Sequence, residues 1–143
     1  MREYYARRAA EYDATSWDAL DRVERDAVEG FVAALAPGRV LDIGCGTGYL
    51  TRLLRGSVVA VDQSEEMLAL ARRRVPRAEF VRADVPPLPF ADGAFDLAFS
   101  SGVYSHVETA AERAAFLAEA LRVARELVVL DQAWRPGREP ESW

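Results

Sequence analysis

Cysteine and histidine are almost absent from this sequence of 143 residues, which contains only Cys45 and His106. A single cysteine cannot form an intramolecular disulfide, and one cysteine with one histidine falls short of the ligand cluster that a zinc ion requires. The composition therefore predicts no metal site, and it fits a reducing, cytoplasmic setting.

Long apolar runs are lacking as well, because no stretch of the sequence reaches the length that spans a membrane. The first five residues carry charge where a signal peptide needs its apolar core. We therefore expect neither export by a signal peptide nor embedding in a membrane.

An excess of positive charge is also missing: 18 basic residues face 23 acidic ones, and the net charge is −5. Non-specific binding to nucleic acid depends on concentrated positive charge, so nucleic acid is not an expected partner.

Half of the residues are apolar, which is typical of a folded globular protein. A single domain is expected, since a chain of this length buries roughly two-thirds of its unfolded surface.

Predicted strands and helices alternate along the chain. Short apolar runs predict strands at residues 39–43, 58–61, 79–82, 95–100 and 127–130. Apolar residues at helical spacing, together with capping residues, predict helices at residues 16–35, 49–55, 65–75 and 110–125. Parallel strands joined by helical crossovers carry helices on both faces of their sheet. We therefore expect an α/β fold, a doubly wound Rossmann-like three-layer sandwich with a mostly parallel sheet.

A glycine-rich turn, residues 42–48, follows the first predicted strand. Ligands of open α/β sheets bind beyond the carboxyl ends of the strands, and glycines let a ligand lie directly against the backbone. The spacing G-x-G-x-G differs from the G-x-G-x-x-G of a dinucleotide site. Asp42 precedes the turn, and its carboxylate would repel a diphosphate but attract an ammonium group. The pattern favours a zwitterionic ligand, with a purely structural turn as the alternative.

A second acidic residue, Asp62, stands at the end of the second predicted strand. A carboxylate at this position can accept hydrogen bonds from both hydroxyls of a ribose. The alternative is a helix N-cap, but Ser64 already serves that role for the following helix. We therefore expect Asp62 to bind a ribose.

Residues 40–48 resemble the first motif of the class I S-adenosylmethionine-dependent methyltransferases. The resemblance implies that S-adenosylmethionine is the cofactor and S-adenosylhomocysteine (SAH) the product. It implies that the backbone of Gly44, Cys45 and Gly46 holds the methionine portion of the cofactor. It further implies that Asp42 engages the cofactor's amino group, directly or through water.

Three further segments extend this resemblance. Residues 62–68 are similar to the second motif of the family, which implies that Gln63 and Met67 lie near the adenosine. Asp84 and Val85 match the position where the family contacts the adenine amino group and ring. Ser100, at the end of the fourth predicted strand, completes the candidate cofactor-binding residues.

The N-terminal segment, residues 4–13, resembles the lid of the family, with Tyr12 expected over the cofactor. The alternative is a solvated amphipathic segment anchored by its tyrosines.

His106 follows the fourth predicted strand, where the family often has a histidine. A base is needed if the acceptor is a hydroxyl or an ammonium, so His106 is the candidate catalytic residue. The alternative is a histidine that makes structural hydrogen bonds.

The predicted domain divides into an N-terminal lid and helix (residues 1–36), a Rossmann-like core (37–134) and a polar tail (135–143). Members of the family usually continue past the fifth strand with a helix and a C-terminal antiparallel hairpin, which this sequence lacks. The fifth strand is therefore expected at an edge of the sheet, where unpaired backbone groups invite pairing with another chain. A truncated chain and a self-associating minimal domain, a homo-oligomer, are both compatible with this expectation.

Three functions remain open at this point. The resemblance favours an enzyme that transfers a methyl group from S-adenosylmethionine to a small-molecule acceptor at oxygen, nitrogen or carbon. A module that binds S-adenosylmethionine or SAH without turnover is the first alternative. A nicotinamide-dependent oxidoreductase is the second, and the glycine spacing and Asp42 disfavour it. The acceptor itself is not predicted, because acceptor contacts come from variable loops.

Overall fold

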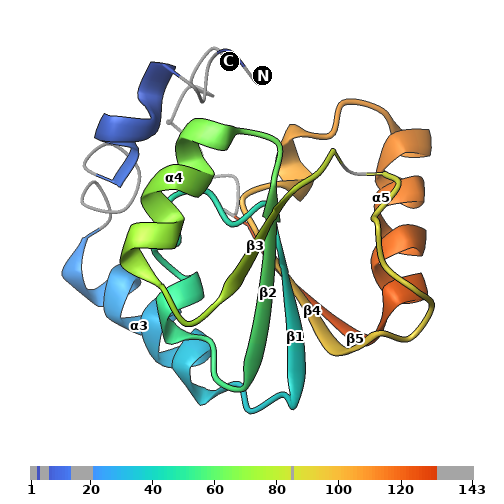
Figure 1. Ribbon diagram of the computed structural model, residues 1–143, viewed down its shortest axis with the longest axis horizontal. Helices are drawn as coiled ribbons and strands as arrows, with labels where there is room; N and C mark the ends of the chain where they lie inside the picture. Colours follow the sequence, from blue (N-terminus) through green and yellow to red (C-terminus); the bar gives the residue numbers. More distant parts are fainter. Residues whose placement is uncertain (1–2, 4–6, 14–20, 85, 132–143) are drawn as a thin grey trace.

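Five parallel strands form one sheet in the computed structural model, which describes residues 3, 7–13, 21–84 and 86–131 (Figure 1). The strand order is β3-β2-β1-β4-β5, and every neighbouring pair is parallel. The strands are β1 (Arg39–Ile43), β2 (Ser57–Asp62), β3 (Glu79–Arg82), β4 (Phe95–Ser101) and β5 (Ala124–Leu130). The doubly wound Rossmann-like fold expected from the sequence is confirmed.

Helices cover both faces of this sheet. Figure 1 shows α3 and α4 on one side of the strands and α5 on the other. Short 3-10 turns occur before α3 and at two of the connections. The helical elements are η1 (Ala9–Glu11), α3 (Arg22–Ala34), η2 (Thr51–Leu53), α4 (Glu65–Arg74), η3 (Tyr104–His106) and α5 (Ala110–Val123).

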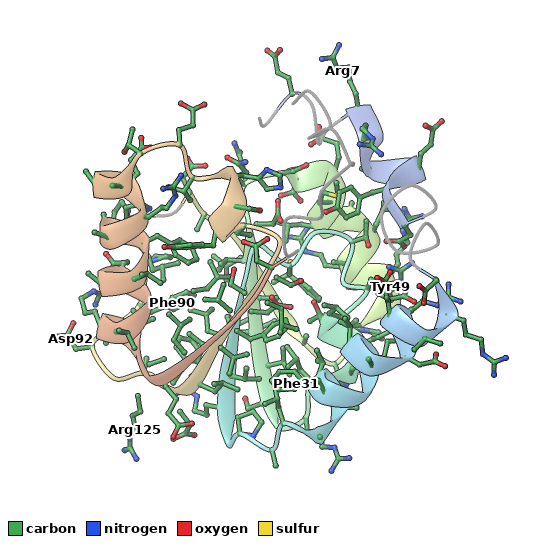
Figure 2. All side chains as sticks on the ribbon, turned by 180° about the vertical axis from the view of Figure 1, so that it is seen from behind. Arg7, Phe31, Tyr49, Phe90, Asp92 and Arg125 are labelled. Atoms are coloured by element: carbon green, nitrogen blue, oxygen red, sulfur yellow. The ribbon has the colours of Figure 1, made fainter. Side chains whose placement is uncertain are left out.

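Alternating side chains of the strands build two separate cores. Leu41 and Ile43 of β1 point to the α5 side, where they join Phe116 in one buried cluster. Val40 points to the opposite side and packs in a second cluster with Val32 of α3. Side chains fill the space between the sheet and its helices (Figure 2). Because both faces of the sheet are covered at its centre, the central strands β1, β2 and β4 are apolar and buried along most of their length.

The order of the strands reverses between β1 and β4. From β1 the chain moves outward to β2 and β3, and then returns to β4 on the other side of β1. The connections leaving β1 and β4 therefore diverge at their carboxyl ends, where Ile43 lies beside Ser100. This switch point is the place where open α/β sheets hold their ligands.

Capping residues predicted from the sequence begin two of the helices. Ser64 accepts a hydrogen bond from the Met67 amide at the start of α4. At the start of α5, Thr109 and Glu112 form a reciprocal capping box. These caps are local features, since a hydroxyl three residues ahead of an amide satisfies a donor that the helix leaves unpaired.

Three of the predicted helices differ from those in the structure. Asp21 caps α3, which begins at Arg22, and the earlier residues 16–20 lie outside the described ones. α5 ends at Val123 rather than near residue 125, because β5 begins at once with Ala124.

The third difference is the helix predicted after the glycine turn, which is wrong. Only the 3-10 turn η2 forms there, and Leu54 is already extended. Gly56 adopts a positive φ of 85° and lies so close to Pro37 and Gly38 that a Cβ would fall 2.5 Å from either carbonyl oxygen. This tight packing turns the chain directly into β2.

The sheet has β3 and β5 as its outer strands within the part of the chain that the structure describes. The expected edge position of β5 is thus confirmed for these residues. The predicted polar tail, residues 135–143, lies outside them. None of the described helices is long and apolar enough to cross a membrane.

Candidate functional site

A pocket opens at the carboxyl ends of β1, β2 and β4, at the switch point of the sheet. The residues that line it come from the N-terminal segment, the ends of β1, β2 and β4, the glycine turn, α4 and the segments that follow β2, β3 and β4. They are Tyr12, Ile43, Gly44, Gly46, Val61, Asp62, Gln63, Met67, Ala83, Ser101, Gly102, Val103 and His106. A smaller hollow adjoins it and shares Tyr12, Gly44, Gly46 and Ser101. Asp42 and Cys45 line only this second hollow.

The glycine turn is held against the end of β2 by its backbone. The amides of Gly44 and Cys45 both donate to the Val61 carbonyl oxygen, at 2.8 and 3.0 Å. Gly44 has a φ of 74°, and a Cβ there would lie 2.2 Å from Val103 Cγ2. A side chain is therefore excluded at residue 44, both by the backbone conformation and by the wall of the pocket.

Asp62 is the hydrogen-bond acceptor at the centre of the site. Its Oδ2 accepts from the Gly46 amide and its Oδ1 from the Ser64 amide, both at 2.9 Å. Burial raises the pKa of Asp62, and the amides of Ser64, Gly46 and Gln63 oppose this shift. Each carboxylate oxygen retains acceptor capacity beyond one amide, so a ligand hydroxyl could still bind.

Asp42 is more deeply buried and is 2 % exposed. Its Oδ2 accepts a hydrogen bond of 2.7 Å from the Thr51 hydroxyl. Burial raises the pKa of Asp42 to about 7; the Thr51 hydrogen bond opposes this shift and the charge of Asp62 adds to it. Bringing a cation into the adjoining hollow would relieve this unfavourable burial of negative charge.

The thiol of Cys45, in the glycine turn, is biased toward its neutral form. Burial, with further contributions from the charges of Asp42 and Asp62, raises the pKa of its thiol. A neutral thiol is a poor nucleophile, so the contribution of residue 45 to a ligand would come from its backbone.

Tyr12, Gln63, Met67 and His106 all line the main pocket, as the sequence predicts. Tyr12 lies over the glycine turn, since its Cε1 is 4.0 Å from the position that a Cβ of Gly46 would take. Burial lowers the pKa of His106, and the charge of Asp131 opposes this shift. The imidazole is therefore biased toward its neutral form, which can accept a proton.

Two candidate residues lie away from the lining of the pocket. Ser100 is fully buried, and its hydroxyl donates to the Ile43 carbonyl oxygen at 3.0 Å. Ser101 lines the pocket in its place. Asp84 is exposed, whereas its neighbour Ala83 lines the pocket. Val85 lies outside the described residues.

Sequence reasoning missed the wall formed by Ser101, Gly102 and Val103. Their position at the carboxyl end of β4, whose last residue is Ser101, would have indicated it, since that is where open α/β sheets hold their ligands. Among the described lining residues, the charged side chains are carboxylates and none is an arginine. The local charge thus favours a cationic group over a phosphate.

Comparison with known proteins identifies relatives of this arrangement. A family model described as a methyltransferase domain matches residues 41–129. The malonyl-[acyl-carrier protein] O-methyltransferase of Serratia marcescens is 36 % identical over 124 residues, which cover 85 % of this chain and 47 % of the relative. The demethylmenaquinone methyltransferase of Clavibacter sepedonicus is 43 % identical over 95 residues, or 62 % of this chain and 39 % of the relative. The chain thus spans about half the length of these relatives or less.

A solved structure has the same architecture and a related sequence. The structure described as the DhpI–SAH complex has a TM-score of 0.71 and 34 % sequence identity. The similarity covers 89 % of this chain and 64 % of that one. The fold and the sequence therefore lead to the same group of proteins.

Proposed function

The chain belongs to the class I S-adenosylmethionine-dependent methyltransferase family, and from this premise we propose that its pocket binds S-adenosylmethionine for methyl transfer to a small-molecule acceptor. The observation that carries the proposal is the glycine turn at the switch point, joined to Asp62 through the Gly46 amide. This arrangement brings a backbone surface and a carboxylate together in the lining of one pocket.

The chemistry of the described residues fits the cofactor. Asp42 would attract the ammonium group of the cofactor, and Asp62 would accept hydrogen bonds from the ribose hydroxyls of the cofactor. An apolar surface suited to an adenine ring is offered by Val61, Met67 and Ala83. The roles expected of Gln63, Asp84, Val85 and the backbone of Cys45 remain predictions. The role expected of Ser100 is not part of the proposal, because its buried hydroxyl donates to the Ile43 carbonyl oxygen.

When bound, S-adenosylmethionine supplies an electrophilic methyl group on a sulfonium. The chain's own contribution is to align the reactants and to exclude water, which can account for much of the acceleration of an in-line displacement. Tyr12 covers the glycine turn, and Val103 and His106 also line the pocket. For a hydroxyl or ammonium acceptor, His106 would take the proton that the acceptor loses.

The acceptor is proposed only as a class. Relatives are named for a malonyl group on an acyl-carrier protein and for demethylmenaquinone. A small or carrier-bound organic acceptor is in keeping with both names. A cytoplasmic location, the absence of nucleic acid and membrane as partners, and self-association through β5 remain predictions.

A second function, binding without turnover, is the alternative, because the observations that carry the proposal concern the cofactor pocket and not the acceptor. The two functions are distinguished by incubating the full chain with methyl-labelled S-adenosylmethionine and a panel of hydroxyl, amine and acyl-carrier-bound acceptors. A labelled product that depends on Asp62 supports the enzyme. Saturable SAH binding without any labelled product supports the binding module.

A further inference from the structure

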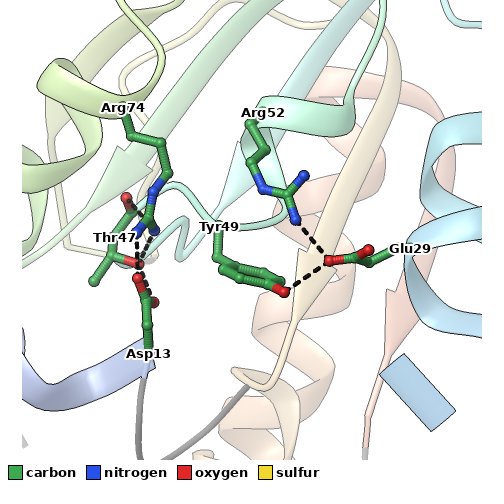
Figure 3. A network of polar contacts seen from close by, with 6 residues as sticks. All are labelled: Asp13, Glu29, Thr47, Tyr49, Arg52 and Arg74. Atoms are coloured by element: carbon green, nitrogen blue, oxygen red, sulfur yellow. Dashed lines mark hydrogen bonds and ion pairs between the residues drawn. The ribbon is translucent and has the colours of Figure 1, made fainter. Parts of the chain in front are cut away.

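The N-terminal segment is tied to the glycine turn by a polar network (Figure 3). Asp13 accepts a hydrogen bond of 2.6 Å from the Thr47 hydroxyl through its Oδ1. Its other oxygen, Oδ2, forms an ion pair with the Arg74 guanidinium. Asp13 therefore joins residues that are 34 and 61 positions away in the sequence.

Arg74, the last residue of α4, binds both partners at once. Its Nη1 donates to Thr47 Oγ1 at 2.9 Å and reaches the Thr47 carbonyl oxygen at 3.3 Å. The side chains of Arg74 and Asp13 are 34 % and 25 % exposed, so water screens this pair less than a fully exposed one. Thr47 is 2 % exposed. Its hydroxyl contacts both Asp13 and Arg74 and so fixes the geometry of the three side chains.

A second group of contacts reaches the same side chain through Tyr49. Arg74 lies over the Tyr49 ring, with 5.7 Å between its Cζ and the ring centroid. The Tyr49 hydroxyl donates to Glu29 of α3 at 2.7 Å, and Arg52 pairs with the same carboxylate oxygen at 2.6 Å. The guanidinium of Arg74 thus also contacts the ring of Tyr49, whose hydroxyl is held by Glu29 of α3.

The consequence for the pocket comes through Tyr12, the neighbour of Asp13. Tyr12 lines both the main pocket and the adjoining hollow, whereas neither Asp13 nor Arg74 is among their described lining residues. We infer that Asp13 and Arg74 are positioning residues, which hold Tyr12 across the cofactor pocket and slow the release of the bound nucleoside. This inference rests on the proposed function.

The test compares SAH binding and release among variants of the full chain. Arg74→Gln and Asp13→Asn each remove the ion pair while keeping a polar side chain. Each should raise the dissociation constant of SAH roughly three- to tenfold, chiefly through faster dissociation. Arg72→Gln is the matched control, because Arg72 pairs with Glu65 on the exposed side of the same helix. Arg72→Gln should leave the dissociation constant of SAH and its rate of dissociation unchanged.

Two further measurements separate positioning from general stability. The double variant should bind SAH no more weakly than either single variant, because both substitutions remove the same ion pair between Asp13 and Arg74. The reversed pair, Asp13→Arg with Arg74→Asp, should recover part of the lost affinity. Amide hydrogen exchange of residues 9–13 should increase in Arg74→Gln while exchange in β1 stays the same.

The outcomes distinguish this inference from the function on which it rests. SAH binding by the wild type, with faster release in the variants and faster exchange at residues 9–13, supports the inference. Unchanged SAH release in variants whose residues 9–13 exchange faster overturns it, while the proposed function stands. A folded wild type that binds no SAH contradicts the proposed function itself, and the inference fails with it.

Discussion

The Gly46 amide donates to Asp62 Oδ2 across 2.9 Å, so the carboxylate at the end of β2 fixes the turn at the end of β1. This side chain orders the backbone of the glycine turn, and in the proposed function it also offers hydrogen-bond acceptors to the ligand. The Ser64 amide on the other oxygen also joins this carboxylate to the start of α4. A change at Asp62 is consequently expected to affect the shape of the pocket as well as its chemistry.

Gly48, the last glycine of the turn, should tolerate substitution poorly, with a loss of stability. Its φ is 81°, and a Cβ would lie 3.2 Å from Ala71 Cα and Cβ in α4. Gly48→Ala should lower the free energy of unfolding by about 1–3 kcal/mol, because it adds backbone strain and crowding. Urea unfolding measures the change.

Gly30 provides the matched control for this substitution. It lies exposed within α3, and a Cβ there would have nothing within 4 Å. Gly30→Ala should raise the free energy of unfolding by about 0.5–1 kcal/mol, because alanine favours the helix. Equal effects of the two substitutions would contradict the packing of the turn against α4.

Asp42 should make stability depend on pH in an unusual direction for an aspartate. Its pKa is raised from 3.8 to about 7, so the folded state holds a proton that the unfolded state has released over this range. The stability that this proton contributes is complete below pH 3.8 and is lost as the pH rises through about 7. Urea unfolding from pH 5 to pH 8.5 should therefore show a decline in wild type that is smaller in Asp42→Asn. The same decline in both proteins would assign it to other groups.

His106 should titrate below an ordinary histidine, because burial lowers its pKa. Asp131 opposes this shift, so Asp131→Asn should lower the pKa of His106 further. The Ser105 amide donates to Asp131 Oδ2 at 2.8 Å, and asparagine can retain that contact. Nuclear magnetic resonance reports the value directly, since the sequence contains one histidine. A wild-type pKa at or above 6.5 would argue against a desolvated imidazole.

Substitution of Ser100 should affect stability, whereas substitution of Ser101 should affect SAH binding. Ser100→Ala removes the buried hydrogen bond to the Ile43 carbonyl, at a cost of about 1 kcal/mol in unfolding free energy, and should leave SAH affinity unchanged. Ser101→Ala changes the wall of the pocket and should weaken SAH binding roughly three- to tenfold. Chemical denaturation and calorimetric titration of both variants measure these effects. The reverse pattern would restore the cofactor role expected for Ser100.

The features predicted correctly from the sequence are those set by neighbouring residues. Apolar runs indicate the strands, and Ser64 and Thr109 begin their helices because a cap acts within three residues. The carboxyl ends of parallel strands meet at one edge of a sheet, so the turn after β1 and Asp62 could be assigned to one pocket.

The features that the sequence did not predict depend on contacts between distant segments. The chain after the glycine turn has the spacing of a helix, but the approach of Gly56 to Pro37 and Gly38 ends it after one 3-10 turn. The choice between Ser100 and Ser101 depends on where β4 stops. The Asp13–Arg74 contact spans 61 residues, and no local pattern indicates it.

The central claim is that the pocket beside Asp62 binds the cofactor, and calorimetric titration of the full chain with SAH tests it most directly. We predict saturable binding at one site, weakened in Asp62→Asn by about 2 kcal/mol, because two charge-assisted ribose contacts are impaired. Asp26→Asn is the control, since Asp26 is 63 % exposed and pairs only loosely with Arg22, at 3.7 Å; it should bind SAH as the wild type does. The absence of SAH binding by the folded chain, or NADH binding at the same pocket with equal affinity, would contradict the account.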